Sequence, residues 1–530
     1  GTASSPELPD EVGEERPGRE ATADNLLDRL LYKGVLPRYA FPTDVAAFHV
    51  FDRDRSTRFR PAFRYTPSQG LPVALSQYAP GKEVWIGNKL WTSGAIYSPL
   101  QSDRYKAWES RRFYYECSVC HYARTETLQN GVRNEVKDCP ACGGEGTLGP
   151  ATYWLRPPGF AHPVSKEEGT SPDDQPARSY ATRAKLTAPT PTEVWSRIND
   201  HIRVHHTRPH LLVTNRGPRE EGYTYCTKCG LIEPTTIPKG QVAAAHQKPF
   251  PDLRNANCPG GGATTGLVLG TDFVTDVLLV SISVNAPLNL QPGLLATDVA
   301  LRTLCEALTK AACGLLELEP NELQAEYRPA LTPAGRDGIE AEIYIYDTLP
   351  GGAGFARRVG DLGISVFERA LVILESCPAA CDRSCYRCLR SYKNKFEHDL
   401  LDRQLGASLL RFLLTGAEPI LETNRLEQST DLLFEDLKRQ GVSGITLERN
   451  RKISVPGLGN VVAPISVSND HGLEIVIALH GPLTPDYPSS ERLRELKEFS
   501  IDVPMILIDE LVVRRNLPSA TSAILAQVVS

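Results

Sequence analysis

The chain of 530 residues contains one methionine, Met505, and does not begin with one. We therefore expect it to be a processed or incomplete segment. No apolar run approaches the ~18 residues of a membrane-spanning helix. Residues 1–20 are acidic and proline-rich and do not resemble a secretory signal peptide. The sequence thus predicts a cytoplasmic protein that does not enter the membrane.

An excess of positive charge is also missing, because 58 Lys and Arg stand against 64 Asp and Glu, for a net charge of −6. Any nucleic-acid binding must therefore come from local basic patches. No GxxxxGK[ST] sequence occurs, which excludes a P-loop ATPase. The glycine-rich turn "DTLPGGAGFARRV" (347–359) also lacks the Lys-Ser/Thr pair. We interpret it as tight strand-to-helix packing rather than a phosphate site.

Cysteine is plentiful, with thirteen residues, and most of them fall in three groups with the spacing of metal ligands. The first group consists of two C-x2-C pairs separated by eighteen residues. This is the spacing of a zinc ribbon, in which four thiolates form a closed structural site. The predicted ligands are Cys117, Cys120, Cys139 and Cys142.

The second group has only three cysteines, so another residue type has to supply the fourth ligand. We predict a Cys3His zinc site completed by a histidine that lies between the second and third cysteines. The predicted ligands are Cys226, Cys229, His246 and Cys258. The alternatives to His246 as fourth ligand are His205, His206 and His210.

The third group has C-x3-C-x3-C-x2-C spacing. Four thiolates leave no coordination position for water, so we expect a structural metal rather than a hydrolytic one. An iron–sulfur cluster or a redox pair are alternatives, because thiolate ligands alone do not distinguish zinc from iron. The predicted ligands are Cys377, Cys381, Cys385 and Cys388, which brings the expected total to about three structural zinc ions.

A run of cations and aromatic residues, "YRCLRSYKNKF" (386–396), overlaps the end of the third group. Cations of this kind bind phosphates and aromatic rings stack on bases. A solvated basic face is the structural alternative. The residues predicted to contact nucleic acid are Arg387, Arg390, Tyr392, Lys393 and Lys395. Two further basic stretches cover 104–112 and 201–219.

The predicted fold is a mixed α/β (α+β) multidomain protein with several structural zinc sites. The expected divisions are a disordered lead-in (1–23), a β-rich N-terminal region with the zinc ribbon (24–155), a linker (156–190), a second zinc-binding region (191–265), a module with the third cysteine group (266–417) and a C-terminal α/β domain (425–530).

The C-terminal domain reads as helix, three strands, helix, strand, helix, an order similar to the core of PD-(D/E)xK nucleases. Asp470 and Glu474 could bind Mg²⁺, but Val476 stands where that chemistry requires a lysine. We expect a degenerate or unrelated domain.

Three stretches, "GTDFVTDVLLV", "YDTLPGGAGFARRV" and "CDRSCYRCLRSYKNKFEHDLLDR", resemble in this order the C-terminal zinc module of MrfA-type superfamily 2 DNA helicases. No helicase motor accompanies them. Together with the upstream zinc ribbon and "LRPPGFAHPV", they make residues 25–415 similar to the DrmB family of the bacterial DISARM anti-phage system.

The resemblance implies a cytoplasmic protein that pairs with the helicase DrmA, as a heterodimer, and helps it engage foreign DNA. By position it also implies that the third cysteine group holds the zinc of the module. We therefore predict a non-catalytic, DNA-binding partner of a helicase. The alternatives are a magnesium-dependent nuclease acting through the C-terminal domain, and an assembly scaffold that does not contact nucleic acid.

Overall fold

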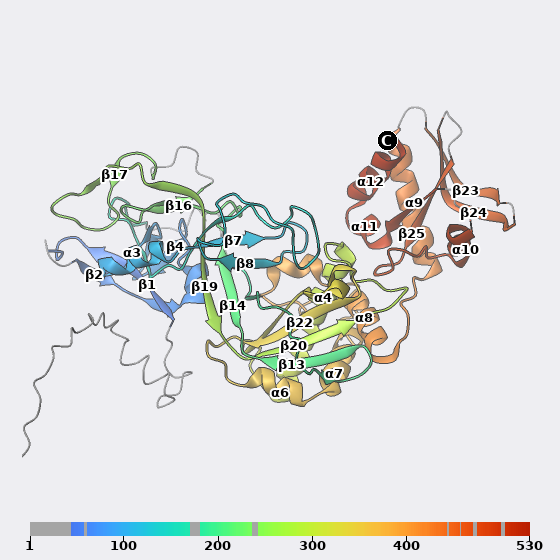
Figure 1. Cartoon of the computed structure of the whole chain (residues 1–530), viewed down its shortest axis with the longest axis horizontal. Coiled ribbons are helices and arrows are strands. Elements are labelled where there is room, and N and C mark those ends of the chain that lie inside the picture. Colours follow the sequence, from blue (N-terminus) through green and yellow to red (C-terminus); the bar gives the residue numbers. More distant parts are fainter. Residues whose placement is uncertain are drawn as a thin grey trace, which may run out of the picture. The chain divides into compact units, whose positions relative to one another are not determined.

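The computed structural model describes residues 44–57, 61–169, 181–235, 242–441, 445–455, 457–469, 474–499 and 504–529 (Figure 1). The predicted lead-in over 1–23 and the first part of the β-rich region lie outside these ranges. Helices and several separate sheets make up the described chain, which confirms the predicted mixed α/β, multidomain class. Among the helices within these ranges, none combines the length and apolar character needed to cross a membrane.

The first sheet is built around β1, which pairs antiparallel with β2 and β3 and parallel with β10. A separate hairpin, β4–β5, turns at Gly87 and Asn88. Both turn residues have positive φ (59° and 61°), the type I′ geometry that suits the twist of a hairpin. The elements are β1 Val45–Asp52, β2 Ala62–Tyr65, β3 Ser68–Gly70, α2 Leu71–Gln77, β4 Glu83–Ile86, β5 Lys89–Thr92, β6 Ala95–Ile96 and β10 Phe160–Ala161.

An eight-stranded sheet has the order β11-β14-β19-β9-β7-β8, with β15 and β16 attached beside β19. It combines strands from four of the regions expected to be separate, including the linker predicted over 156–190. The strands therefore cross the boundaries expected after residues 155, 190 and 265. They are β7 Arg112–Glu116, β8 Ala123–Glu126, β9 Thr152–Leu155, β11 Lys185–Leu186, β14 His210–Asn215, β15 Tyr223–Cys226, β16 Ile232–Pro234 and β19 Ala263–Val274.

A five-stranded antiparallel sheet, β12-β13-β20-β22-β21, supports the third cysteine group. Its side chains alternate between two cores, as the period of two in a strand requires. In β20, Leu278 and Val280 pack with the helices α4, α6, α7 and α8, whereas Val277 and Leu279 face the other core. The elements are β12 Ser196–Arg197, β13 Ile202–Thr207, β20 Val277–Ser283, α4 Leu295–Leu316, β21 Leu323–Pro329, β22 Glu340–Asp347, α6 Phe355–Asp361, α7 Ile364–Glu375 and α8 Arg403–Thr415.

The glycine-rich turn after β22 is closed by a carboxylate of the chain itself. Asp347 accepts hydrogen bonds from the backbone N–H groups of Ala353 (2.6 Å), Phe355 (3.1 Å) and Ala356 (2.7 Å). Burial raises the pKa of Asp347, and these three bonds oppose that effect. The amides that a phosphate would use are therefore occupied, as the packing interpretation of this turn predicts.

The C-terminal domain follows the predicted order up to its last strand and then ends with two helices instead of one. Its sheet has the order β23-β24-β25-β26, in which only β25 and β26 run parallel. The elements are α9 Thr423–Gln440, β23 Ile445–Val455, β24 Gly459–Asn469, β25 Glu474–His480, α10 Glu491–Phe499, β26 Met505–Asp509, α11 Glu510–Arg515 and α12 Leu517–Val529.

Candidate metal centres and the adjoining basic segment

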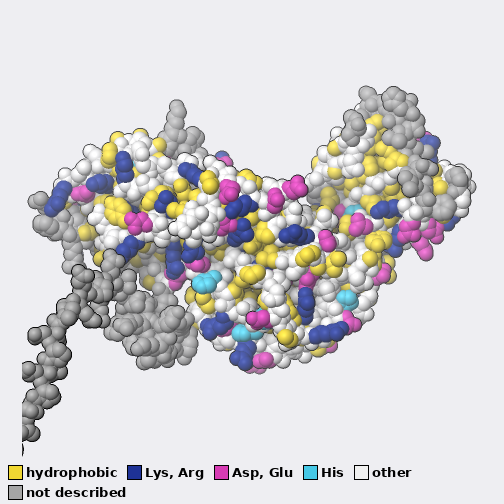
Figure 2. All heavy atoms as spheres, viewed as in Figure 1, with side chains coloured by type: hydrophobic (Ala, Val, Ile, Leu, Met, Phe, Trp, Pro, Cys, Tyr) yellow, Lys and Arg dark blue, Asp and Glu magenta, His cyan; other side chains and the backbone are white. Residues whose placement is uncertain are grey.

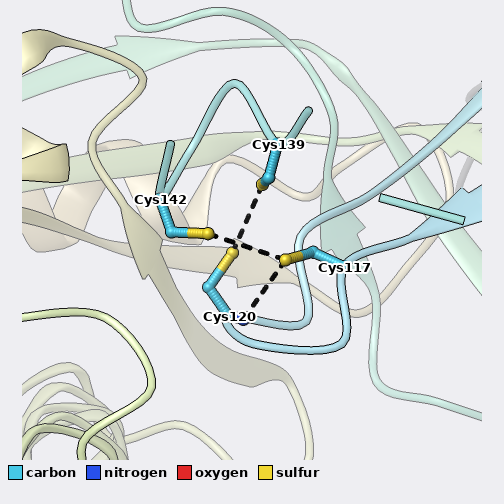
Figure 3. A group of neighbouring side chains, drawn as sticks. All are labelled: Cys117, Cys120, Cys139 and Cys142. Atoms are coloured by element: carbon cyan, nitrogen blue, oxygen red, sulfur yellow. Dashed lines mark hydrogen bonds between the residues drawn. The ribbon is translucent and has the colours of Figure 1, made fainter. Parts of the chain in front are cut away.

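The first cysteine group closes around one point (Figure 3). The β7–β8 turn supplies Cys117 and Cys120, and a second loop supplies Cys139 and Cys142. The Sγ atoms of Cys117 and Cys142 are 3.6 Å apart, as are those of Cys120 and Cys139, and all four lie within 4.8 Å of one another. A disulfide has an S–S distance of about 2.05 Å. Tetrahedral zinc with Zn–S bonds of about 2.3 Å places its sulfurs about 3.8 Å apart, so these residues fit zinc.

The second group uses the β15–β16 turn, which holds Cys226 and Cys229, and the hairpin of β17 (His246–Gln247) and β18 (Asn257–Cys258). His246 and Cys258 are register partners in that hairpin. The Sγ atoms of Cys226 and Cys258 lie 3.8 Å apart, and His246 Nε2 lies 3.0 Å from Cys229 Sγ. The structure thus brings together the predicted Cys3His set.

A hydrogen bond at Nδ1 of His246 indicates that Nε2 is the nitrogen that faces the metal. Nδ1 lies 2.7 Å from the carbonyl oxygen of Ala244, to which its N–H can donate. That bond fixes the tautomer and leaves Nε2 free to ligate. The alternative histidines lie on β13 and β14 and face carboxylates of other residues: His205 faces Glu193, His206 faces Asp276 and His210 faces Asp272.

The third group lies between α7 and the 3-10 helix η2 (Lys395–Leu400). Its Sγ···Sγ distances are 3.5 Å (Cys377–Cys381), 3.6 Å (Cys377–Cys385 and Cys381–Cys388) and 3.7 Å (Cys385–Cys388). The backbone N–H of Cys381 lowers the pKa of Cys377 to about 6, whereas burial raises the pKa of Cys381 and of Cys388. Three four-ligand sets in the described chain confirm the prediction of about three structural zinc ions.

Cations outside the metal loops donate to the backbone carbonyls of these loops. Arg104 on α3 (Gln101–Glu109) donates to Lys228 O (3.1 Å) and to Cys229 O. Arg403 donates to Cys381 O at 2.6 Å. A site with three or four thiolates around Zn²⁺ keeps a net negative charge, so cations beside it stabilise the charge and hold the loop.

The remaining loop contacts follow the same pattern. Lys310 donates to the carbonyl oxygens of Arg387 (3.2 Å) and Cys388, and Arg336 on α5 (Pro333–Arg336) donates to Pro140 O (3.2 Å). The sequence gives no signal for these contacts, because each cation lies far along the chain from the loop that it holds.

Residues 386–396, which we call the basic-aromatic segment, lead from the last zinc ligands into η2. Arg387 and Lys393 are exposed. Although the Lys393 side chain is exposed, partial desolvation of its ammonium group and the neighbouring charge of Arg183 lower its pKa. Lys395 Nζ lies 4.1 Å from the ring centroid of Tyr392. Of the five residues predicted to contact nucleic acid, Arg390 and Lys395 are half-buried, and Arg390 Nε donates to Ser384 Oγ at 2.9 Å.

In the other two basic stretches, several arginines pair with carboxylates of the protein, although Arg203 and Arg208 stay exposed. In 201–219, Arg203 pairs with Glu340 and Arg208 with Asp276 (3.2 Å). In 104–112, Arg112 pairs with Asp272 (3.3 Å) and Arg104 is buried beside the second zinc site. On the face that Figure 2 displays, Lys and Arg are scattered among Asp and Glu instead of forming one continuous basic surface.

The nuclease alternative depends on positions in β25. Val476 is buried and packs in one core with Leu493 and Leu496 of α10. A side chain at this position therefore faces the hydrophobic interior of the domain. Asp470 lies outside the described residues.

Residues 304–389 match the family described as the MrfA Zn-binding domain. This range contains all four cysteines of the third group, which favours zinc over an iron–sulfur cluster there. The chain is also 31% identical over 440 residues to Druantia protein DruE of Escherichia coli (strain UMEA 4076-1). That alignment covers 78% of this chain and 23% of DruE, so the chain spans about a quarter of the length of this relative.

Among solved structures, the chain is similar to the DUF1998 helicase MrfA bound to DNA, with a TM-score of 0.33 and 11% identity over 70% of this chain and 34% of that one. The similarity to MrfA in a second crystal structure has a TM-score of 0.25 and 9% identity, over 68% and 34% of the two chains. We base no conclusion on these weak similarities.

Proposed function

We propose that this protein is a non-catalytic, nucleic-acid-binding subunit that works with a superfamily 2 helicase in anti-phage defence. The observation that carries the proposal is the exposure of the basic-aromatic segment directly beside the third zinc site. The zinc ion and the cations that hold its loop fix the backbone from which Arg387 and Lys393 project. The match to the MrfA Zn-binding domain and the similarity to Druantia protein DruE, a defence protein, support the helicase-related part.

Within this role we assign the chain to DrmB of DISARM, a cytoplasmic protein whose helicase partner is DrmA. A Druantia-type assembly is the alternative that the similarity to DruE favours. Co-purification of the tagged protein from its native host, with mass spectrometry of the bound helicase, distinguishes the two. Recovery of a DrmA-type helicase supports DISARM, and recovery of no helicase contradicts the partner role.

DNA binding is tested by removing the exposed cations with the double substitution Arg387→Ala and Lys393→Ala. Log affinity falls with log salt concentration, and each phosphate contact adds about 0.7 to 0.9 to the magnitude of that slope. Removing two cations should therefore reduce the magnitude by about 1.5. Fluorescence anisotropy with a labelled oligonucleotide over a salt series measures it. The matched control is Arg357→Ala with Arg358→Ala, which removes two exposed arginines from α6. Equal slopes for the wild type and the first variant would rule out this surface.

The absence of catalysis is part of the proposal and rests on the position of Val476. A lysine there would have to enter the core formed with Leu493 and Leu496, which disfavours an ion at that point. Purified protein incubated with plasmid DNA and Mg²⁺ should leave the DNA intact. Cleavage that is lost in Glu474→Ala would establish the nuclease alternative instead.

A further inference from the structure

The basic-aromatic segment holds the three most exposed aromatic side chains in the described chain. Tyr386, Tyr392 and Phe396 are 67%, 74% and 66% exposed. The next most exposed aromatic residues, Trp85 and Tyr105, reach 54% and 46% and lie in other parts of the fold. Single exposed apolar residues are ordinary on protein surfaces, but three large rings within eleven residues are not.

We propose that these three rings form a stacking platform for unpaired bases, so that the segment binds single-stranded rather than double-stranded nucleic acid. The inference rests on the proposed function and names the form of nucleic acid that it recognises. Aromatic rings stack on any base that exposes its face, and each stacked base strengthens binding by about tenfold. In a duplex those faces are covered by the neighbouring base pairs, which leaves the phosphates and the base edges in the grooves to bind.

The backbone that carries the rings is fixed between Tyr392 and Phe396 by Asn394. This side chain is buried, and its Nδ2 donates to Leu389 O (2.9 Å) and Glu306 Oε2 (2.8 Å). Its Oδ1 accepts from the backbone N–H of Ser391 at 2.7 Å. One amide thus joins both sides of the turn to α4, so the rings stand on a defined scaffold.

A network of charges holds the C-terminal end of the segment. Glu397 lies 2.6 Å from Arg183 Nη2 and 3.6 Å from Arg302 Nε. Arg302 in turn pairs with Glu326 at 2.5 Å and is almost completely buried. With zinc at the other end, the segment is held on both sides, and binding then requires little further ordering of the protein.

Cations lie among the rings, with Lys395 over a face of two of them. Lys395 Nζ is 4.1 Å from the centroid of the Tyr392 ring and 5.0 Å from that of Phe396. Exposed Arg387 follows Tyr386 directly in sequence. A strand with bases on the rings therefore has positive charge beside its backbone, the combination found in surfaces that bind single strands. This mixture favours a nucleic acid over an apolar protein partner.

The test compares a labelled 20-nucleotide oligo(dT) with a 20-base-pair duplex in fluorescence anisotropy. The variant carries Tyr386→Ala, Tyr392→Ala and Phe396→Ala. We expect its affinity for the single strand to fall about 100-fold or more and its affinity for the duplex to change less than about threefold. Its salt slope should stay at the wild-type value, because no cation has been removed.

Two control variants test whether the loss of affinity comes from removing these three aromatic rings. Tyr386→Phe, Tyr392→Phe and Phe396→Tyr keep every ring and should preserve single-strand affinity within about threefold. Trp85→Ala with Tyr105→Ala removes two exposed rings elsewhere and should have no effect on either ligand. Unchanged zinc content and thermal unfolding show that the alanine variant is folded.

Equal losses on the single strand and the duplex would overturn the stacking platform while leaving the proposed DNA binding intact. Unchanged DNA affinity together with loss of the co-purifying helicase would assign the rings to a protein interface instead. If the wild-type protein binds neither oligonucleotide, the proposed function itself fails.

Discussion

The stretch 201–219 and the basic-aromatic segment are both rich in cations, but the fold uses them differently. In 201–219 the chain forms strands, and the arginines meet carboxylates such as Glu340 and Asp276. In the basic-aromatic segment the chain turns around a zinc site, and Arg387 and Lys393 point outward. Arg203 and Arg208 are exposed as well, so positive charge in a sequence indicates a binding surface only where the fold does not pair it with carboxylates.

The largest difference between the two regions should follow from breaking the third zinc site with Cys388→Ser. Zinc supplies much of the folding free energy of small metal-bound loops, about 10 kcal/mol or more in isolated zinc-finger peptides. We expect one of the three zinc ions to be lost and the basic-aromatic segment to unfold locally. Trypsin should then cleave after Arg387 and Lys393, while the bond after Arg203 stays protected within β13.

Elemental analysis and limited proteolysis with mass spectrometry measure both effects. Cys313→Ser is the matched control, because Cys313 is buried in α4 outside the three clusters. A Cys388→Ser protein that retains all three ions and an intact segment would show that this loop does not depend on its metal.

A second contrast comes from removing one arginine from each region. Arg203 bonds Ser281 Oγ (3.1 Å) and pairs with the buried carboxylate of Glu340. Since the Arg203 side chain is half-exposed and its charge is screened, Arg203→Ala should lower the free energy of unfolding by only about 1–2 kcal/mol. Its DNA affinity should not change.

Arg387→Ala should instead weaken DNA binding and leave the free energy of unfolding within about 0.5 kcal/mol of the wild type. Urea denaturation at neutral pH and anisotropy on the same preparations measure the pair. Similar stability losses in both variants would remove the distinction between a region whose arginines pair with carboxylates and one that presents them to a ligand.

The smallest expected effect concerns alkaline pH. Partial desolvation and Arg183 lower the pKa of Lys393, so this residue loses its charge at lower pH than an ordinary lysine. The charge is complete below the lowered pKa and lost as pH rises through it. DNA affinity should therefore fall about two- to threefold between about pH 7.5 and about pH 9.5.

Lys393→Arg should remove this decline, because arginine stays charged throughout that range. The stretch 201–219 contains arginine and no lysine, so its ion pairs should not change over the same interval. A decline that persists in Lys393→Arg would assign the titration to another group.

Sequence spacing predicted the metal centres well because their ligands come in short local pairs. Cys117 and Cys120 lie in a single turn, and so do Cys226 and Cys229. The choice of His246 was harder, since three other histidines lie within 41 residues of it in the sequence. The register of β17 with β18 settles that choice by placing His246 opposite Cys258.

The domain divisions were harder to anticipate, because they depend on pairing between distant strands. β10 and β11 have two residues each, too few for a periodic pattern, yet each joins a sheet.

The exposure of individual side chains could not be predicted from the sequence either. The sequence allows Tyr392 to be either a packing residue or a surface ring, and only the fold of the zinc loop decides between them. The cations that hold the metal loops, such as Lys310, also depend on tertiary structure alone.

The position of β19 has a consequence for how the protein is made. This strand lies between β14 and β9 and also pairs with β15. The ribosome releases β7, β8 and β9 roughly a hundred residues before β19, so the sheet lacks its central strand for roughly 5–20 s at ordinary synthesis rates. During that interval the edge of β9 is open to wrong partners. All four ligands of the zinc ribbon beside β7 and β8 are already synthesised at that stage. The ribbon can therefore stabilise the nascent chain until β19 is available to pair.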